Sequence, residues 1–185
     1  EAQRLKCHTL VIGECGHATK AALLFQKVYG KLGYQHIQIK SILEVSHGFL
    51  KEGLLKLDPN KNPETFTYHD PCNLGRGAGI YEEPRELLMA AARPYFEMAP
   101  DRKMNYCCGG GGGLVVVEDI HDWRMTVGGL KKVEQLRATG AKVVVAPCAN
   151  CKKQLRELVK FHKLDMDVVG LHDVIGKAII FGKQE

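Results

Sequence analysis

Long hydrophobic runs are absent from this 185-residue sequence. Apolar stretches such as Leu114–Val117 and Val143–Pro147 are far too short to cross a bilayer, which takes about 20 residues, so we expect no direct membrane span. The sequence has no signal-peptide pattern and does not begin with Met, so we expect a fragment or a processed piece. The net charge of +5 is spread along the chain and is too diffuse to predict a nucleic-acid partner.

An even number of cysteines, which a disulfide-bonded secreted domain needs, is absent as well. The chain has seven cysteines, two of them adjacent, and it is long enough to bury a hydrophobic core without disulfides. Its hydrophobic content of 45% and charged content of 25% are typical of a globular domain. These features favour a reducing compartment in which the thiols serve as metal ligands or redox groups.

Short β-branched runs alternate with helical patterns along the chain. Strands are predicted, the first of them buried, at His8–Gly13, Gln35–Lys40, Thr65–His69, Tyr95–Met98, Lys142–Pro147 and Asp167–Val169. Helices are predicted at Ala18–Leu32, Ile42–Lys51, Pro84–Arg93, Asp119–Thr139, Ala149–His162 and His172–Ile180. Asp58–Glu64 is expected to be a surface loop, and Gly140 to end the longest helix. This order predicts an α/β fold around mostly parallel sheets with flanking helices.

The sequence also contains an internal repeat. Thr9–Phe25 parallels Val143–Leu158, because each has a strand, then a cysteine, then a helix. The likeness continues, with a short strand and an apolar helix in His36–Leu50 and in Asp167–Ile180. The repeat predicts two halves in one compact domain, a degenerate and truncated first half in residues 1–57 and a complete half in residues 58–185.

Six cysteines follow predicted strands or an extended segment, namely Cys15, Cys72, Cys107, Cys108, Cys148 and Cys151. In α/β sheets, ligands bind beyond the carboxyl ends of the strands, so the loops that carry these cysteines are expected to converge on one rim. By the repeat, Cys15 occupies the position of Cys148, whereas Ala18 stands where the second half has Cys151. Cys7 precedes the first strand and is expected on the opposite side as an ordinary thiol.

The spacing of the cysteines disfavours a structural zinc site. Such a site usually takes two C-x-x-C knuckles, and only Cys148 and Cys151 form one. Spacers of 34 residues after Cys72 and 39 residues after Cys108 separate the other members. Adjacent thiolates diverge in an extended chain and suit two irons better than one small ion. Five thiolates exceed what zinc or a cubane cluster needs, so the count favours an unusual multi-iron cluster.

Five consecutive glycines, residues 109–113, follow the adjacent cysteines. Gly109 and Gly110 are predicted to let the backbone approach a cluster without crowding it, and their N–H groups to face sulfide and thiolate. A flexible linker is the alternative. A nucleotide-phosphate loop is disfavoured because no Lys-Ser/Thr follows the glycines.

The strings HDPCNLGRG, NYCCGGGGG and APCANC together resemble the cysteine-rich CCG domain. That domain occurs in heterodisulfide reductases and in iron–sulfur subunits of glycolate, lactate and glycerol-phosphate dehydrogenases. The first spacer fits the family pattern and the second is slightly longer. GECGHA and CCGGGGG look most like the K subunit of the membrane complex associated with dissimilatory sulfite reductase, a relative of the heterodisulfide reductase D subunit. The paired ferredoxin motif that usually precedes the domain is absent.

The resemblance implies a noncubane 4Fe–4S cluster that reduces or forms a disulfide or trisulfide, on a small sulfur-carrier protein. It implies partner subunits that donate electrons, both iron–sulfur subunits and membrane subunits with haem or quinone. The location would then be cytoplasmic, peripheral to the inner membrane through those partners. An electron relay in a flavin-linked dehydrogenase and a non-redox metal-binding interaction module stay open as alternatives. Carried over by position, the cluster ligands are Cys72, Cys107, Cys108, Cys148 and Cys151.

Cys15, His17 and Arg76 are the candidates for catalysis. Cys15 is interpreted as a sixth ligand, a thiol that captures a sulfur of the substrate, or a relic of the repeat. His17 is a candidate proton donor to a departing thiolate, and Arg76 a candidate site for an anionic group. A satisfied loop histidine and an exposed loop arginine are the alternatives. His69 and Asp70 are expected to support the ligands, with Asp70 capping the turn that follows it.

Overall fold

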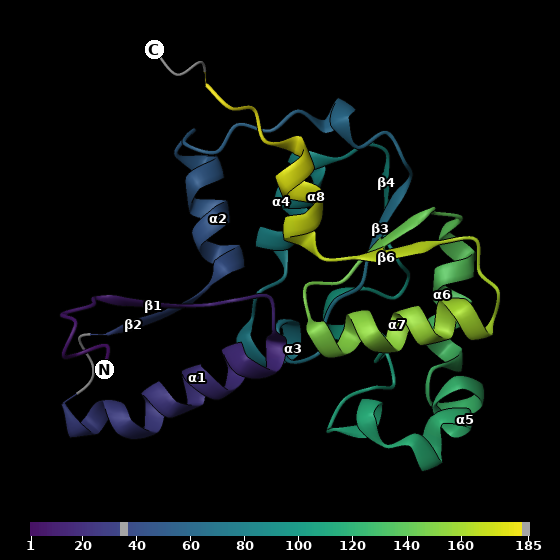
Figure 1. The fold of residues 1–185 in the computed structure, drawn as a ribbon, viewed down its shortest axis with the longest axis horizontal. Coiled ribbons are helices and arrows are strands. Elements are labelled where there is room, and N and C mark those ends of the chain that lie inside the picture. Colours follow the sequence, from purple (N-terminus) through teal and green to yellow (C-terminus); the bar gives the residue numbers. More distant parts are fainter. Residues whose placement is uncertain (34–36, 183–185) are drawn as a thin grey trace.

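The structure, a computed structural model, describes residues 1–33 and 37–182. Its strands form two sheets in which every pair is parallel (Figure 1). The smaller sheet pairs β1 (Thr9–Ile12) with β2 (Gln38–Ser41). The larger sheet has the order β4-β3-β5-β6, built from β3 (Phe66–Tyr68), β4 (Tyr95–Phe96), β5 (Val143–Val145) and β6 (Asp167–Val169). The predicted α/β fold with parallel sheets and flanking helices is confirmed.

Helices occupy most of the segments in which the sequence predicts them. They are α1 (Gly16–Tyr29), α2 (Ile42–Lys51), α3 (Gly75–Ala78), α4 (Glu82–Ala91), α5 (His121–Trp123), α6 (Leu130–Thr139), α7 (Ala149–Phe161) and α8 (Leu171–Ala178). Gly140 ends α6 in the left-handed conformation, with φ of 62°, as predicted. Among the described residues, no helix has the length and apolar character that crossing a membrane requires.

Two segments depart from the predicted elements. The predicted strand at Gln35–Lys40 begins at Gln38, and Gln35 and His36 lie outside the described residues. The single helix predicted over Asp119–Thr139 is wrong. A short helix, α5, is followed by a π-helical turn, Arg124–Gly128, and then by α6.

The break in this helix lies at Gly129, where the surrounding atoms leave no room for a side chain. A Cβ on Gly129 would lie 2.5 Å from the Leu158 side chain and 2.9 Å from the Arg124 carbonyl oxygen. The Gly129 N–H reaches that same carbonyl, five residues back, at 2.8 Å. Glycine thus permits a close approach to α7 that a regular helix would not make.

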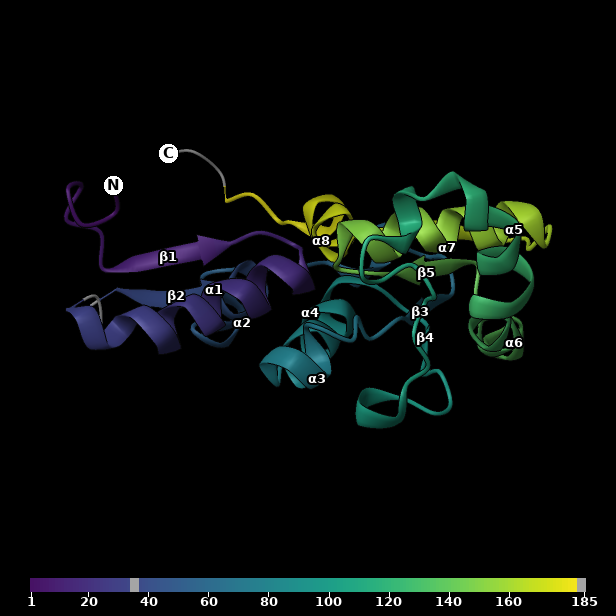
Figure 2. The ribbon, with the colours of Figure 1, turned by 90° about the horizontal axis from the view of Figure 1, so that it is seen from below.

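The larger sheet has a hydrophobic core on each face, because successive strand residues point to opposite sides. Figures 1 and 2 show α4 and α8 on one side of this sheet and α6 on the other. Val143 and Val145 pack with the α4 and α8 side, whereas Val144 packs with α6 and α7. The β3 and β5 strands are therefore buried on both faces, and the loops that follow them start from fixed positions.

The structure reproduces the internal repeat as β1–α1–β2–α2 and β5–α7–β6–α8. Strands β1 and β2 pair in parallel as β5 and β6 do. Cys15 precedes α1 with φ of −152° and ψ of 106°, and Cys148 precedes α7 with φ of −159° and ψ of 125°. The two cysteines therefore cap equivalent helices in the same extended conformation, at the positions that the sequence comparison matched.

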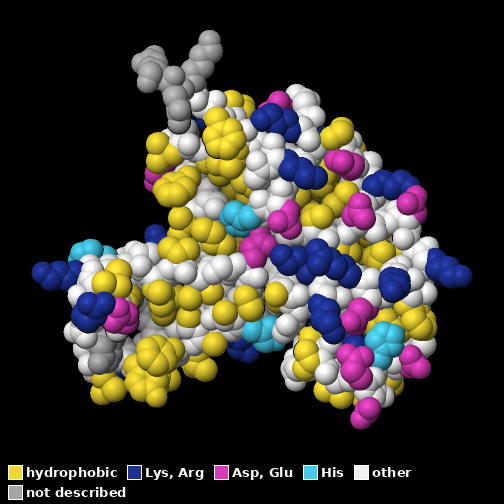
Figure 3. Space-filling view, in the orientation of Figure 1, with side chains coloured by type: hydrophobic (Ala, Val, Ile, Leu, Met, Phe, Trp, Pro, Cys, Tyr) yellow, Lys and Arg dark blue, Asp and Glu magenta, His cyan; other side chains and the backbone are white. Residues whose placement is uncertain are grey.

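The two copies differ in burial, and the prediction that the first strand is buried is wrong. Leu10 and Val11 of β1 are 43% and 44% exposed, whereas Val144 of β5 is fully buried. Strand β5 lies between β3 and β6 and is covered by helices on both faces, but β1 pairs with β2 alone among the described residues. Figure 3 shows apolar side chains gathered over the arm of the molecule that β1, β2 and α1 form.

Equivalent positions in the two copies should therefore contribute unequally to stability. Leu158 on α7 is fully buried, while Phe25 at the matching position of α1 is 57% exposed. We expect Leu158→Ala to lower the free energy of unfolding by about 2–5 kcal/mol, because it opens a cavity in the core. Phe25→Ala should change it by no more than about 0.5 kcal/mol. Urea unfolding followed by circular dichroism measures both, and equal losses would contradict the unequal burial.

Candidate metal centre

The order of strands in the larger sheet creates a topological switch point at the carboxyl ends of β3 and β5, which we call the crevice after its position in open α/β sheets. Strand β3 pairs with β4 on one side and with β5 on the other. After β3 the chain therefore adds a strand on one side of it, and then crosses to add β5 on the other side. Ligands of open α/β sheets bind beyond the carboxyl ends of the strands at such a point. Cys72 lies in the loop after β3 and Cys148 in the loop after β5, so both loops enter this crevice.

Five thiols form a continuous string in the crevice. The sulfur atoms of Cys108 and Cys151 lie 3.5 Å apart. The other thiols continue the string at both ends, each near enough to shift the pKa of the next, in the order Cys72, Cys107, Cys108, Cys151 and Cys148. All of the cysteines are free thiols. The structure brings together the five residues predicted as ligands, and their role in binding metal stays a prediction.

These thiols oppose one another's ionisation. Hydrogen bonds from Cys108 and Cys72, with the Gly109 N–H, lower the pKa of Cys107. The same contacts with Cys107 raise the pKa of Cys72, and raise the pKa of Cys108 to about 12. A hydrogen bond from Cys151 lowers the pKa of Cys148 to about 4. Five thiolates so close together need a compensating positive charge, which bound metal supplies.

The glycine loop approaches both the thiols and the helices behind it. The Gly109 N–H donates to the Cys107 sulfur at 3.4 Å, and the Gly110 N–H lies close enough to Cys108 to oppose the rise in its pKa. That these amides face a cluster stays a prediction. The steric need for glycine comes from the protein itself. A Cβ on Gly109 would lie 2.8 Å from the Gly128 carbonyl oxygen, and one on Gly110 would lie 2.8 Å from the Gln154 Cβ.

The first copy of the repeat reaches the same crevice. Figures 1 and 2 show that α1 and α7 point their N-terminal ends toward each other. The Gly16 N–H and the His17 ring lie close enough to the Cys148 sulfur to lower the pKa of that thiol. The sulfurs of Cys15 and Cys148 and a ring nitrogen of His17 lie within 4.8 Å of one another. Cys15 and His17 therefore lie on the rim with the string of thiols, as the sequence predicts.

His69 lies behind the string and is fully buried. One of its ring nitrogens lies within 4.8 Å of the sulfurs of Cys108 and Cys151. Neither ring nitrogen has a hydrogen-bond partner among the described residues, and burial lowers the pKa of the ring. Buried polar atoms are rarely left unpaired, and the sulfurs of Cys108 and Cys151 are the possible metal ligands nearest to this ring.

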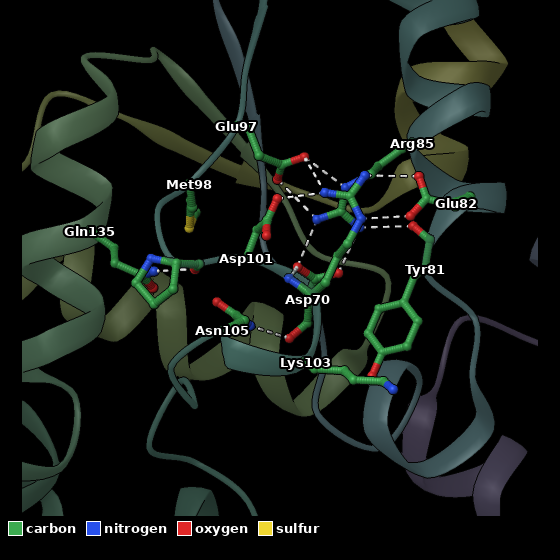
Figure 4. Close-up of polar contacts among 12 residues, drawn as sticks. Asp70, Tyr81, Glu82, Arg85, Glu97, Met98, Asp101, Lys103, Asn105 and Gln135 are labelled. Carbon is green, nitrogen blue, oxygen red and sulfur yellow. Dashed lines mark hydrogen bonds and ion pairs between the residues drawn. The ribbon is translucent and has the colours of Figure 1, made fainter.

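A buried polar network fixes the loops that carry the cysteines (Figure 4). Arg85 donates to both carboxylate oxygens of Asp70, at 2.8 and 2.7 Å, and to Glu97 at 2.7 and 2.9 Å. Asn105, two residues before Cys107, donates to the Asp70 carbonyl at 2.6 Å. We expected the Asp70 side chain to cap the turn that follows it. Instead, its carboxylate accepts a hydrogen bond from the Arg102 N–H at 2.8 Å. Removing one partner of such a buried ion pair costs about 3–5 kcal/mol.

Arg76 contacts the loop that leads to the centre, whereas Cys7 lies away from it. The Arg76 Nη1 donates to the carbonyl oxygens of Lys103 and Asn105, both at 2.9 Å, so this exposed arginine holds the loop that leads to Cys107. Its predicted role in binding an anion stays a prediction. Cys7 lies before β1, at the other end of that strand from Cys15, as expected of a residue outside the site.

Sequence reasoning missed two features of the centre. Asn105 links the loops before Cys72 and Cys107, and Lys132 is buried behind it. Neither stands in a recognisable motif. The sequence gives one signal that this part of α6 faces a core. Val133 and Leu136 are apolar and three residues apart, as on one face of a helix, and both are buried.

Comparison with known proteins places this geometry in context. Residues 66–156 match the family model described as "CCG: Cysteine-rich domain". The chain is 30% identical over 176 residues to the Hdr-like menaquinol oxidoreductase iron-sulfur subunit of Archaeoglobus profundus, covering 91% of this chain and 30% of that protein. It is 30% identical over 182 residues to the D subunit of the dihydromethanophenazine:CoB–CoM heterodisulfide reductase of Methanosarcina acetivorans, covering 97% and 43%.

A third relative comes from a bacterium. The Bacillus subtilis protein named "Probable iron-sulfur-binding oxidoreductase FadF" is 34% identical over 155 residues, covering 82% of this chain and 21% of that protein. The chain thus spans less than half the length of these curated relatives. The matched family residues include all five thiols of the string.

The hydrogen bonds to Cys107 predict an unusual labelling profile for the metal-free chain. Because the pKa of Cys107 is lowered, its thiolate persists as the pH falls, and the residue is exposed. We expect its rate of alkylation by iodoacetamide to stay nearly constant between pH 8 and pH 6. An ordinary thiol, with a pKa of about 8.5, slows about tenfold per pH unit below that value. Mass spectrometry of the labelled peptide measures the rate, and a tenfold fall per unit at Cys107 would contradict the assignment.

Proposed function

Because this chain belongs to the family of proteins that carry the cysteine-rich CCG domain, at residues 66–156, we propose that it is the iron–sulfur part of a heterodisulfide-reductase-like oxidoreductase. One observation carries the proposal, namely the string of five free thiols in the crevice between β3 and β5. The names of the relatives support it, because they describe iron–sulfur subunits and a heterodisulfide reductase subunit.

The residues present fit a cluster with several irons. Thiolates are the ligands of iron–sulfur clusters, and Cys72, Cys107, Cys108, Cys148 and Cys151 offer more of them than zinc takes. The unpartnered His69 ring faces two of these sulfurs. We propose that the five cysteines hold a noncubane 4Fe–4S cluster, with the amides of Gly109 and Gly110 donating toward its sulfur atoms.

The reaction that suits this site is reduction, or in the reverse direction formation, of a disulfide or trisulfide. When bound, the cluster supplies the electrons for this chemistry. Cleaving a disulfide to two thiols takes two electrons and two protons. The His17 ring, which contacts Cys148, is placed to deliver one of these protons. Cys15 places a further thiol beside it, as a candidate to capture a substrate sulfur, and exposed Arg76 offers charge for an anionic substrate or partner.

The partners follow from the same proposal. We propose that electrons arrive from iron–sulfur subunits and from membrane subunits with haem or quinone, and that the substrate sits on a small sulfur-carrier protein. The chain would then lie in the cytoplasm, peripheral to the inner membrane through those subunits. A role like that of the K subunit of the sulfite-reductase-associated complex fits these partners.

We also propose that residues 1–57 are the degenerate first copy of the repeat and residues 58–185 the complete one, which the matching caps Cys15 and Cys148 support.

The metal content of the anaerobically purified chain tests the cofactor. We expect about four irons and four sulfides per chain and a brown protein. Cys107→Ser should lose most of the iron because it removes the thiol that links Cys72 to Cys108 in the string. Cys7→Ser, outside the site, should keep all of it. A colourless protein with one zinc would overturn the cluster and favour a metal-bound interaction module.

A kinetic test addresses His17 and the bond-breaking role. The loaded chain, supplied with a low-potential reductant and a small disulfide, should release thiol. His17→Gln should slow this release about 100-fold by removing the proton donor, with iron content unchanged. The exposed His8→Gln is the matched control and should leave the rate unaltered. A loaded chain that takes up electrons and releases no thiol would instead favour a pure electron relay.

A further inference from the structure

Three cationic side chains are buried among the residues that the structure describes, and one of them differs from the others. Arg85, Arg124 and Lys132 are at most 2% exposed. Arg85 pairs with the carboxylates of Asp70 and Glu97, and Arg124 pairs with Glu157 at 2.6 Å. Lys132 contacts no carboxylate in the part of the chain that the structure describes. Burying a charge without an opposite charge is costly.

The Lys132 ammonium has only neutral partners. It donates to the Asn105 Oδ1 at 2.6 Å and to the Gln135 Oε1, and its Nζ lies 3.7 Å from the Met98 sulfur. These three partners, Asn105, Gln135 and Met98, are labelled in Figure 4. Hydrogen bonds to neutral groups satisfy the donors of an ammonium and leave its charge uncompensated.

The position of Lys132 points to the source of compensation. Asn105 precedes the Cys107–Cys108 pair by two residues, so the ammonium lies directly behind that loop. Burial lowers the pKa of Lys132 to about 8, and negative charge on Cys108, Asp70, Cys151 and Cys107 opposes this shift. Asp70 already pairs with Arg85. The remaining anionic groups near the ammonium are therefore the cysteines of the string.

We propose that Lys132 is the countercharge of the cluster held by the five cysteines, and that it stabilises the more reduced, more negative state of that cluster. The inference rests on the proposed function. A fixed positive charge in a poorly solvated place favours the added electron and raises the reduction potential. Lys132 is thus a positioning and tuning residue, which touches Asn105 and acts on the cluster through its field.

Redox titration of the full chain, reconstituted anaerobically with iron and sulfide, tests the inference. Electron paramagnetic resonance follows the cluster in wild type and in variants of equal iron content. Lys132→Gln keeps a hydrogen-bond donor and removes the charge, so its midpoint potential should shift to more negative values. Lys132→Arg keeps the charge and should stay near wild type. Lys131→Gln, at an exposed neighbour that pairs with Glu134, is the matched control and should leave the potential unchanged.

The outcomes separate the two claims. A Lys132→Gln potential equal to that of wild type, at equal iron content, would overturn the countercharge and leave the cluster in place. A wild-type chain without iron would overturn the proposed function and this inference with it. If Lys132→Gln does not fold, Lys132→Met, of similar length and uncharged, provides the same comparison. A merely structural lysine would change urea unfolding and leave the potential where it is.

Discussion

The direct pairing of β3 with β5 is the constraint on which the rest of the centre depends. The two strands are far apart in sequence, yet Tyr68 lies beside Val145 in the ladder, and the His69 N–H extends the ladder to the Val145 carbonyl at 2.9 Å. Because both strands are buried on both faces, neither can slide without exposing a core. The loops that leave their carboxyl ends are therefore held within reach of each other, and thiols from three loops meet there.

Much of this arrangement follows from short-range patterns. Runs such as Val143–Val145 are strands because β-branched residues suit a strand buried on both faces, and Gly140 ends a helix because it takes a positive φ. The spacing of the cysteines after the strands then predicts that the thiols meet on one rim, and the structure brings them together. These predictions succeed because each depends on local conformation and on one general rule about parallel sheets.

The remaining features depend on tertiary contacts between distant parts of the chain, which the periodicity of the sequence does not reveal. The helix predicted over Asp119–Thr139 breaks because Gly129 meets Leu158 of a distant helix. The amphipathic spacing of that segment holds on both sides of the break, so periodicity alone could not reveal it. The exposure of β1 depends on which strands and helices lie beside it. Lys132 looks like a surface lysine in the sequence, and only the packing of α6 against the cysteine loop buries it.

Several contacts join the two copies of the repeat, among them the hydrogen bonds from His172 to Glu14, both at 2.6 Å, and the approach of Gly16 to the Cys148 sulfur. The Gly16 N–H that lowers the pKa of Cys148 belongs to the first copy, while the thiol belongs to the second. The acidity of Cys148 therefore depends on both copies, first on Cys151 of its own copy and then on the N-terminal end of α1 from the other.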